Sequence, residues 1–367
     1  MPSFIRRRDL LVQLGAVSAG LLLPQGALSQ GAVLEDLAAQ IPEWMREFHV
    51  VGAAVAVVRG GKREWRGDFG WRSLYPRAPV EPSTIFEAAS LSKPVFAYAL
   101  LTLAAEGKFD LDRPLTGFMP QPFSSRVPKL MASEVPADPR LARITPRMVL
   151  SHSTGFPNWG RGKPLALQSE PGEKFGYSGE GYVYLQNVVE HVTGESLDDL
   201  VRARVFTPLR MPDSSFVWRA DYDARAAIGY DRLGPKEKDK PKQALAAATL
   251  HTTAADFARF LSAILYPSAA GLDANWIEKM LSPQTKIDAS LSWGLGWGLE
   301  ERPPGRAFWQ WGDNGEFKAF AMGSREEGTA LIVLTNSALG LRLCRKIVEQ
   351  VLPGPHPALA FGMLDYS

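Results

Sequence analysis

The sequence has little cysteine and almost no net charge, and each shortage excludes a class of protein. Its single cysteine, Cys344, excludes an intrachain disulfide, and no cluster of cysteines and histidines has the spacing of a structural zinc site. The 367 residues carry 41 Lys and Arg against 39 Asp and Glu, for a formal net charge of +2. Because a nucleic-acid-binding protein usually has a strongly basic surface, neither DNA nor RNA is an expected partner.

Several motifs of common enzyme classes are also missing. No Gly-x-Ser-x-Gly elbow of an α/β-hydrolase is found, and no glycine-rich loop for nucleotide phosphates. What is present is an ordinary globular composition, with 46% hydrophobic and 22% charged residues, which argues against wholesale disorder. The 33 glycines and 28 prolines exceed the average share, so loops are expected to be plentiful.

The first 29 residues resemble an export signal. The basic run 6–8 precedes an apolar stretch at 10–23, and residues 27–29 offer the small side chains of a signal-peptidase site. Arg7-Arg8 followed by paired leucines resembles the twin-arginine type, which carries folded proteins across the bacterial inner membrane. A membrane anchor is the alternative, but the apolar run is about 14 residues and a spanning helix needs about 20. We expect cleavage, a periplasmic mature protein and no stable membrane anchor afterwards.

Local patterns predict regular elements at both ends of the mature chain. Helical spacing of apolar residues predicts a helix over 33–48, and valine-rich sequence around Gly60-Gly61 predicts a hairpin of strands 50–58 and 62–70. Further helices are expected at 90–106, 182–192, 253–265 and 341–352, and further strands at 294–300, 317–324 and 329–335. The middle of the chain is rich in proline and is expected to form loops and short helical pieces.

This distribution predicts two subdomains, since the mature chain is too long for one simple core. Residues 30–115 and 245–367 are expected to build one sheet from both ends of the chain. Residues 116–244 are expected to form an inserted, mostly helical subdomain. The charged stretch 236–242 within it is expected to be a solvated loop.

The first candidate for chemistry is the tetrad Ser90-Leu91-Ser92-Lys93. If Ser90 lies at a helix start, Lys93 lies one turn further on the same face and can reach the Ser90 hydroxyl. The helix N-terminus favours a developing alkoxide, and the Ser90 backbone N–H can serve as an oxyanion donor. The alternative is a helix cap followed by a solvated lysine, because about one Ser-x-x-Lys is expected by chance in such a chain.

Two further segments carry candidate site residues. Tyr177 precedes Ser178-Gly179, and a neighbouring lysine ammonium is expected to push the phenol pKa from about 10 toward ionisation, which makes a general base. The alternative is a buried aromatic ring with one satisfied hydroxyl. Gln310-Trp311-Gly312-Asp313 precedes an expected strand, where Gly312 would let a substrate approach the strand edge and complete an oxyanion hole. The alternative there is an ordinary turn.

Together these motifs resemble those of the β-lactamase and penicillin-binding-protein-like serine hydrolases, closest to the branch of class C β-lactamases, DD-carboxypeptidases and esterases. The tetrad at 90–93 matches that family's first motif. Tyr177-Ser178-Gly179 stands where the family has Tyr-x-Asn, and Gln310-Trp311-Gly312 stands where it has Lys-Thr-Gly or His-x-Gly. Less specific matches lie at 111–115, 148–155, 252–256 and 294–297.

The resemblance implies both a fold and a set of roles. The implied fold is α+β, an antiparallel sheet flanked by N- and C-terminal helices, with an inserted helical subdomain and the site between the two parts. Ser90 is implied to be the nucleophile that accepts the acyl group, Lys93 its activator and Tyr177 the base. The residues implied around the substrate and its oxyanion are Gly179, Gln310, Gly312 and Asp313, the last through its N–H group.

Two departures from the family pattern bear on the substrate. Gly179 lacks the amide that in relatives steadies the lysine and binds an acylamino group, and the neutral Gln310 holds a carboxylate less strongly than an ammonium does. Penicillins and D-Ala-D-Ala peptides both carry that carboxylate, so ester-like substrates are favoured. Trp159 and other aromatic residues near the motifs line either an apolar acyl pocket or the core. His152 is implied to be structural.

The expected function is an exported, cofactor-free serine hydrolase that forms an acyl-enzyme with an ester, amide or lactam carbonyl. Its expected partner is a small-molecule or peptide substrate, and no metal is expected. A rival from another class is a catalytically degenerate protein of the same fold that binds peptidoglycan or peptide. The sequence predicts no oligomeric state.

Overall fold

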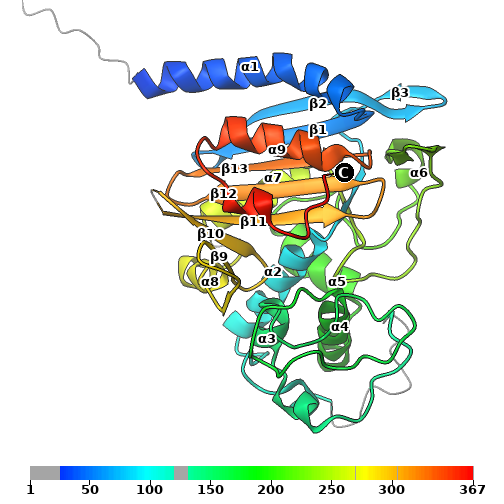
Figure 1. Cartoon of the computed structure of the whole chain (residues 1–367), viewed down its shortest axis with the longest axis vertical. Coiled ribbons are helices and arrows are strands. Elements are labelled where there is room, and N and C mark those ends of the chain that lie inside the picture. The colour runs from blue at the N-terminus through cyan, green and yellow to red at the C-terminus, as the bar shows by residue number, and fades with distance from the viewer. Residues whose placement is uncertain (1–24, 120–130, 269, 304, 367) are drawn as a thin grey trace, which may run out of the picture.

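A nine-stranded antiparallel sheet organises the molecule (Figure 1). The computed structural model describes residues 25–119, 131–268, 270–303 and 305–366. The predicted signal features up to residue 24 lie outside the described residues. Within the described ranges, no helix has both the length and the apolar character needed to cross a membrane.

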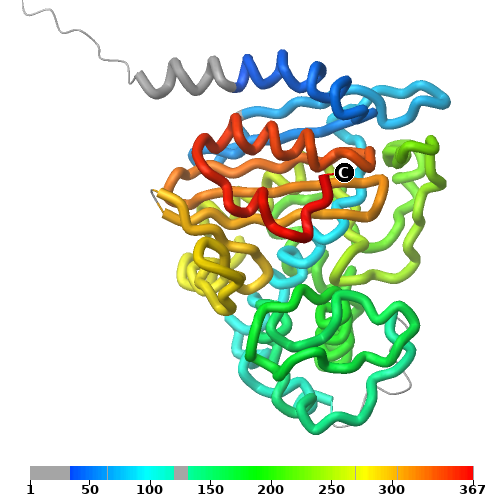
Figure 2. Tube along the Cα trace, in the orientation of Figure 1, coloured from blue at the N-terminus to red at the C-terminus, as the bar shows by residue number. Residues whose placement is uncertain are grey.

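The two ends of the chain share this sheet, in the order β3-β2-β1-β13-β12-β11-β10-β9-β8. The N-terminal strands are β1 (Gly52–Arg59), β2 (Lys62–Leu74) and β3 (Arg77–Pro79). The C-terminal strands are β8 (Thr285–Lys286), β9 (Leu291–Trp293), β10 (Gly298–Arg302), β11 (Gly305–Asp313), β12 (Lys318–Ser324) and β13 (Thr329–Thr335). The first strand of the chain, β1, pairs with the last, β13, which Figure 2 shows as blue beside orange. This confirms the predicted sheet built from both termini.

Both faces of the sheet are covered by helices. Helices α1 (Gln25–Glu47) and α9 (Gly340–Val351) lie on one face, and α2 (Ser92–Ala105) and α7 (Ala254–Leu265) lie toward the other (Figure 1). Successive residues of β1 alternate between the two hydrophobic cores, with Val55 in the core below α1 and α9 and Ala56 in the opposite core. The sheet therefore separates two cores and has no solvent face in β1.

The chain between α2 and β8 is made mostly of short elements. They are η1 (Leu115–Gly117), η2 (Pro139–Arg143), α3 (Pro146–Leu150), α4 (Gly179–Thr193), α5 (Leu197–Val201), η3 (Arg202–Phe206), α6 (Tyr222–Arg225), β5 (Tyr230–Asp231), β6 (Gly234–Pro235), β7 (Leu250–Thr252) and α8 (Ala274–Met280). Strand β4 (Phe86–Ala89) precedes α2 and pairs with β7, and η4 (Pro357–Ala360) follows α9. The boundaries of the inserted subdomain stay a prediction.

The predicted elements agree with the structure except near the C-terminal motif. The residues before the expected strand at 317–324 form strand β11, whose central part is buried on both faces and so lacks the alternation by which strands are recognised. The expected strand at 294–300 is wrong in its first half. Gly296 has φ +99° there, and a Cβ would lie 2.5 Å from Cβ of Ala97, so the chain bends closely against α2 before β10 begins.

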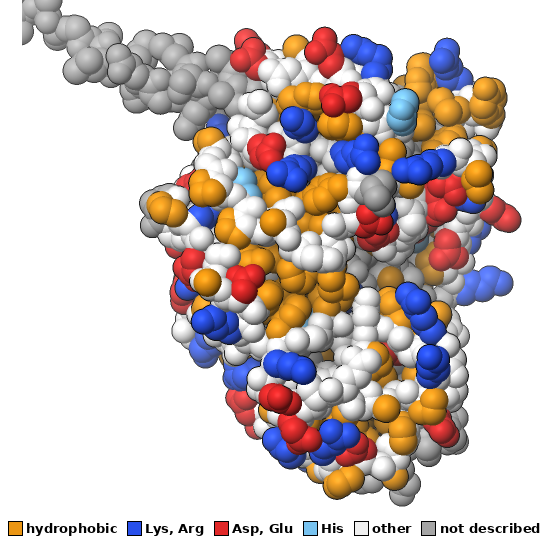
Figure 3. Space-filling model, viewed as in Figure 1, with side chains coloured by type: hydrophobic (Ala, Val, Ile, Leu, Met, Phe, Trp, Pro, Cys, Tyr) orange, Lys and Arg blue, Asp and Glu red, His pale blue; other side chains and the backbone are white. Residues whose placement is uncertain are grey.

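The surface carries charges of both signs. On the face seen in Figure 3, Lys and Arg side chains are interspersed with Asp and Glu, which matches the near-neutral composition. The predicted solvated loop at 236–242 includes lysines paired with acids, among them Lys240, whose Nζ lies 2.6 Å from Asp223 Oδ1. Pairs as exposed as this one contribute little to stability.

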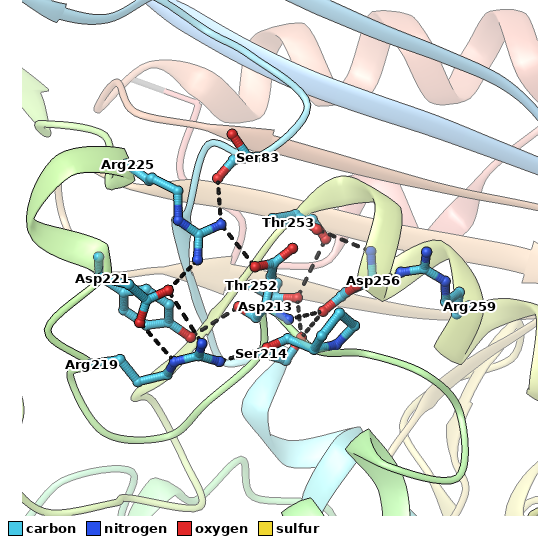
Figure 4. A network of polar contacts seen from close by, with 12 residues as sticks. Ser83, Asp213, Ser214, Arg219, Asp221, Arg225, Thr252, Thr253, Asp256 and Arg259 are labelled. Carbon is cyan, nitrogen blue, oxygen red and sulfur yellow. Dashed lines mark hydrogen bonds and ion pairs between the residues drawn. The ribbon is translucent and has the colours of Figure 1, made fainter.

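A buried polar network ties the middle of the chain to α7 (Figure 4). The Asp256 carboxylate accepts hydrogen bonds from the backbone N–H of Asp213, at 2.8 Å, and the hydroxyl of Ser214, at 3.0 Å. Thr253 caps the helix, because its Oγ1 accepts from the Asp256 N–H at 3.1 Å. Burial raises the pKa of Asp256 to about 6, against the donors that lower it, so the carboxyl is ionised above neutral pH.

We expect Asp256→Ala to lower the free energy of unfolding by about 1–3 kcal/mol, because the buried Ser214 hydroxyl and the partly buried N–H of Asp213 lose their acceptor. Urea unfolding at pH 8 measures this, with Asp36→Ala as the control on the exposed face of α1. Equal midpoints for the two variants would show that the network adds no stability.

Candidate active site

Ser90 lies in the tight turn between β4 and α2. The preceding residue, Ala89, has φ +49°, an uncommon conformation for a residue with a side chain and one that clusters at functional sites. The hydroxyl of Ser92 fixes this turn, because it donates to the Ala89 carbonyl at 2.6 Å and accepts from the Leu250 N–H of β7 at 3.0 Å. The second serine of the tetrad therefore holds the first in place.

Lys93 reaches Ser90 as the sequence spacing predicts. Its Nζ lies 3.0 Å from Ser90 Oγ and 2.9 Å from the carbonyl oxygen of Ala247, and 4.8 Å from the ring centroid of Tyr177. The side chain is fully buried, and this burial lowers the pKa of the Lys93 amine to about 7. Near neutral pH a large share of the amine is thus unprotonated and able to accept the Ser90 proton.

Tyr177 meets the same pair from the loop before α4. Its hydroxyl is hydrogen-bonded with Ser90 and accepts a hydrogen bond from Gln310 Nε2 at 3.0 Å. Burial nevertheless raises the pKa of the phenol above its ordinary value, so the expectation that Lys93 would push Tyr177 toward ionisation is wrong. Burial lowers the pKa of Lys93 and so leaves it only partly charged near pH 7, and desolvation of the phenol outweighs the hydrogen bonds from Ser90 and Gln310 that lower its pKa. Tyr177 is a proton donor at rest.

His152 positions Tyr177 and has the features of a structural residue. Its Nδ1 accepts from the backbone N–H of Ser178 at 3.0 Å, and its ring centroid lies 4.3 Å from that of Tyr177. Burial and the charge of Lys93 hold the pKa of His152 well below its ordinary value, so the ring is neutral. An uncharged ring packed against the phenol steadies the loop and adds no competing charge.

Gln310 faces Tyr177 from strand β11. Its side chain is fully buried, and its Nε2 also donates to the Trp311 carbonyl at 2.9 Å. Its Oε1 is buried and has no hydrogen-bond partner among the described residues. A substrate carboxylate would have to compete with Tyr177 for this amide, which was expected at the sequence level to bind substrate.

Trp159 occupies the space beside Gly179. A Cβ built on Gly179 would lie 2.5 Å from Cζ2 of the Trp159 ring, so the indole fills the position where a longer side chain would begin. The backbone N–H of Gly179 donates to both the main-chain carbonyl oxygen and the side-chain Oδ1 of Asn158, each at 3.0 Å. The aromatic wall and the glycine are thus complementary, a pairing that the separate motifs do not reveal.

Gly312 brings β11 close to β4, the strand that precedes Ser90. A Cβ on Gly312 would lie 2.4 Å from the carbonyl oxygen of Ala88, so a side chain there would push β11 away from β4. The next residue, Asp313, is exposed, and its carboxylate pairs with Lys318 and accepts the Gly315 N–H at 2.9 Å. Asp313 can therefore contribute its backbone to the site, while its side chain is engaged in the turn.

The structure brings together Ser90, Lys93, Tyr177 and Gln310, with Gly179 and Gly312 as close-packed positions beside them. Sequence reasoning missed the contributions of Ser92 and Ala247, and it named Trp159 without its contact with Gly179. Ser92 was visible as the hydroxyl inside the tetrad. A main-chain carbonyl such as that of Ala247 leaves no signal in a sequence. Over the described ranges, no group of three or more His, Cys, Asp and Glu residues is arranged to hold a metal ion.

Comparisons with known sequences agree with one another. Residues 34–345 match the family model described as Beta-lactamase. Esterase EstB of Burkholderia gladioli is 28% identical over 328 residues, which cover 77% of this chain and 80% of that protein. Protein flp of Staphylococcus aureus (strain N315) is 26% identical over 202 residues, 52% of this chain but 40% of that protein.

Solved structures show the same fold at low identity. A class C beta-lactamase superimposes with a TM-score of 0.74 and 17% identity, covering 89% of this chain and 98% of the other. The octameric penicillin-binding protein homologue from Pyrococcus abyssi gives a TM-score of 0.72 and 22% identity, covering 86% and 76%. These likenesses confirm the predicted α+β architecture.

The contact between Gly179 and Trp159 generates a stability prediction. Gly179→Ala is expected to lower the melting temperature, because its Cβ overlaps the indole, and Trp159→Ala in the same chain is expected to remove most of that effect. Gly176→Ala, three residues earlier, is the matched control, since nothing lies within 4 Å of its Cβ. Thermal unfolding of the four variants measures this. Additive losses in the double variant would contradict the overlap.

Proposed function

The chain belongs to the beta-lactamase family and is a serine hydrolase of that fold, and we propose that it cleaves ester-like substrates through an acyl-enzyme on Ser90. The observation that carries the proposal is the 3.0 Å contact between Ser90 Oγ and a fully buried Lys93 amine. A nucleophile needs a base that is unprotonated at the working pH, and burial supplies it by lowering the pKa of this lysine to about 7.

In the acylation step, Ser90 Oγ attacks the substrate carbonyl carbon as the neutral Lys93 amine takes its proton. The developing oxyanion is held by the backbone N–H groups of Ser90 and Asp313, at the start of α2 and the end of β11. The bond to the leaving alcohol then breaks, and the alcohol oxygen receives a proton from the Tyr177 hydroxyl. The products are a Ser90 ester of the acyl group and a free alcohol.

Gln310 assists the proton transfer through Tyr177. Its Nε2 donates to the Tyr177 oxygen, so the hydrogen bond strengthens as the phenol gives up its proton. The Lys93 ammonium formed by acylation lies over the same ring and stabilises the phenolate. The proton returns from Lys93 to Tyr177, and the pair is then ready to activate a water that attacks the acyl-enzyme and releases the acid.

The surroundings of the site favour an uncharged substrate. The amide of Gln310 is bonded to Tyr177, and the space beside Gly179 holds the Trp159 indole in place of an amide side chain. Gln310 is therefore a weak partner for a substrate carboxylate, and position 179 offers no side-chain amide to bind an acylamino group. The likeness to Esterase EstB over 77% of this chain supports the same substrate class.

The sequence features at 1–29 support export to the periplasm by the twin-arginine pathway.

Labelling with a fluorophosphonate probe tests the nucleophile. We expect the wild-type protein to be labelled and Ser90→Ala to remain unlabelled, because phosphonylation needs the activated hydroxyl. A panel of short-chain aryl esters, a chromogenic cephalosporin, and D-amino-acid amides and dipeptides tests the substrate class against the same control. Absence of wild-type labelling would favour a binding protein without catalysis. Faster turnover of the cephalosporin than of every ester would overturn the ester preference.

The pKa of Lys93 generates a pH prediction. Because the pKa is lowered to about 7, the neutral amine is the minor form at pH 6 and the major form at pH 8. The acylation rate is therefore expected to fall about tenfold per pH unit below 6 and to level off above 8. Stopped-flow measurement of alcohol release in the first turnover reports this rate. Lys93→Arg, which stays charged, is expected to lose about 10²–10⁴-fold at every pH. A wild-type rate that keeps rising to pH 10 would contradict the assignment.

A further inference from the structure

We propose that Asn314 is a positioning residue, which clamps the turn carrying the Asp313 N–H against the nucleophile's strand through Glu87 and against the loop that holds Lys93 through Ala248. This inference rests on the proposed function, because the Asp313 N–H is assigned there as an oxyanion donor. No sequence motif points to either Asn314 or Glu87.

A single side-chain amide joins three parts of the site. Asn314 Nδ2 donates to Glu87 Oε2 at 2.9 Å and to the carbonyl oxygen of Ala248 at 3.3 Å. Glu87 lies on β4, three residues before Ser90. Ala248 directly follows Ala247, whose carbonyl binds the Lys93 amine. The amide thus connects the oxyanion turn with the nucleophile's strand and with the lysine's acceptor.

The turn after β11 is rigid enough to transmit this constraint. The backbone N–H of Asn314 bonds the Phe317 carbonyl at 3.1 Å, and the Asp313 carboxylate accepts from Gly315, so the turn is closed by its own bonds. The close approach of Gly312 to the Ala88 carbonyl sets the distance between β11 and β4. The Asn314 clamp lies just beyond it and fixes the orientation of the adjacent Asp313 peptide. An oxyanion donor acts only within a narrow range of positions.

Glu87 is an acceptor in either protonation state, but its bond to Asn314 is stronger when it is ionised. The pKa of Glu87 is raised to about 7, chiefly by burial; the hydrogen bond from Asn314 lowers it, and the charges of Asp239 and Glu316 add to the rise. His251, opposite Glu87 in the β4–β7 pair, is neutral because burial lowers its pKa. The clamp is therefore expected to tighten as the pH rises through 7.

The decisive experiment compares Asn314→Leu, Glu87→Leu and Glu87→Gln in wild-type background. Asn314→Leu and Glu87→Leu are each expected to lower kcat for an aryl ester about tenfold to a hundredfold, with KM within about threefold, because the oxyanion donor is displaced. Glu87→Gln keeps an acceptor oxygen and is expected to retain kcat within about threefold. Asn187→Leu, which loses a bond to the Val183 carbonyl on α4, is the control and is expected to keep wild-type kcat.

The double variant Glu87→Leu/Asn314→Leu distinguishes positioning from general stability. If the two residues act as one clamp, its kcat loss is close to that of either single variant. Multiplicative losses, or wild-type kcat in Asn314→Leu, would overturn the proposal. Should Asn314→Leu fail to fold by circular dichroism, Asn314→Asp replaces it. In that variant the carboxyl group at position 314 faces that of Glu87. The two are expected to share a hydrogen bond and hold the turn below pH 6, and to repel each other when both are ionised above pH 7. A ratio of variant kcat to wild-type kcat that does not change with pH would equally overturn the clamp.

Fluorophosphonate labelling distinguishes failure of the proposed function from failure of the Asn314 proposal. If the wild type is not labelled, the proposed function fails. If the wild type and Asn314→Leu are labelled at the same rate and turn over at the same rate, the proposed function stands and the clamp alone is wrong.

Discussion

The burial of one lysine amine is the constraint on which the site depends. Among the described residues, Lys93 contacts a serine hydroxyl, a backbone carbonyl and the faces of two tyrosine rings. None of these partners carries a full negative charge that would repay the loss of hydration of an ammonium. Burial therefore lowers the pKa of Lys93 to about 7 and leaves, next to Ser90, an amine that can accept a proton near neutral pH.

The fold serves this site by bringing distant segments of the chain to one place. Ser90 comes from the turn before α2 and Lys93 from the first turn of that helix. Tyr177 comes from the middle of the chain, and Gln310 and Asn314 come from β11 and the turn that follows it. The pairing of β1 with β13 makes one sheet of the two ends of the chain, and the close approach of Gly312 to Ala88 places β11 beside β4, next to Ser90. Each of these side chains makes only local contacts, but its position in the site depends on the whole sheet.

The sequence predicted the outline of the fold and the contact between Ser90 and Lys93, since both follow local rules of periodicity and spacing. The sequence-based predictions failed where burial determines how a strand is recognised or how a pKa shifts. Strand β11 was missed because its buried residues do not alternate, and the pKa of Tyr177 was expected to move in the wrong direction because desolvation is not visible in a motif. The fit of Trp159 to Gly179 and the bonds of Asn314 were inaccessible for a different reason, since each joins residues whose contact only the folded chain creates.

Nuclear magnetic resonance of the protein labelled with ¹³C at lysine Cε measures the protonation of Lys93 directly. The variant Lys93→Arg identifies its signal among those of the other lysines. The account predicts one Cε resonance that titrates with a midpoint near pH 7. A midpoint near the ordinary lysine value of about 10.4 would contradict it, because Ser90 would then face an ammonium and not a base.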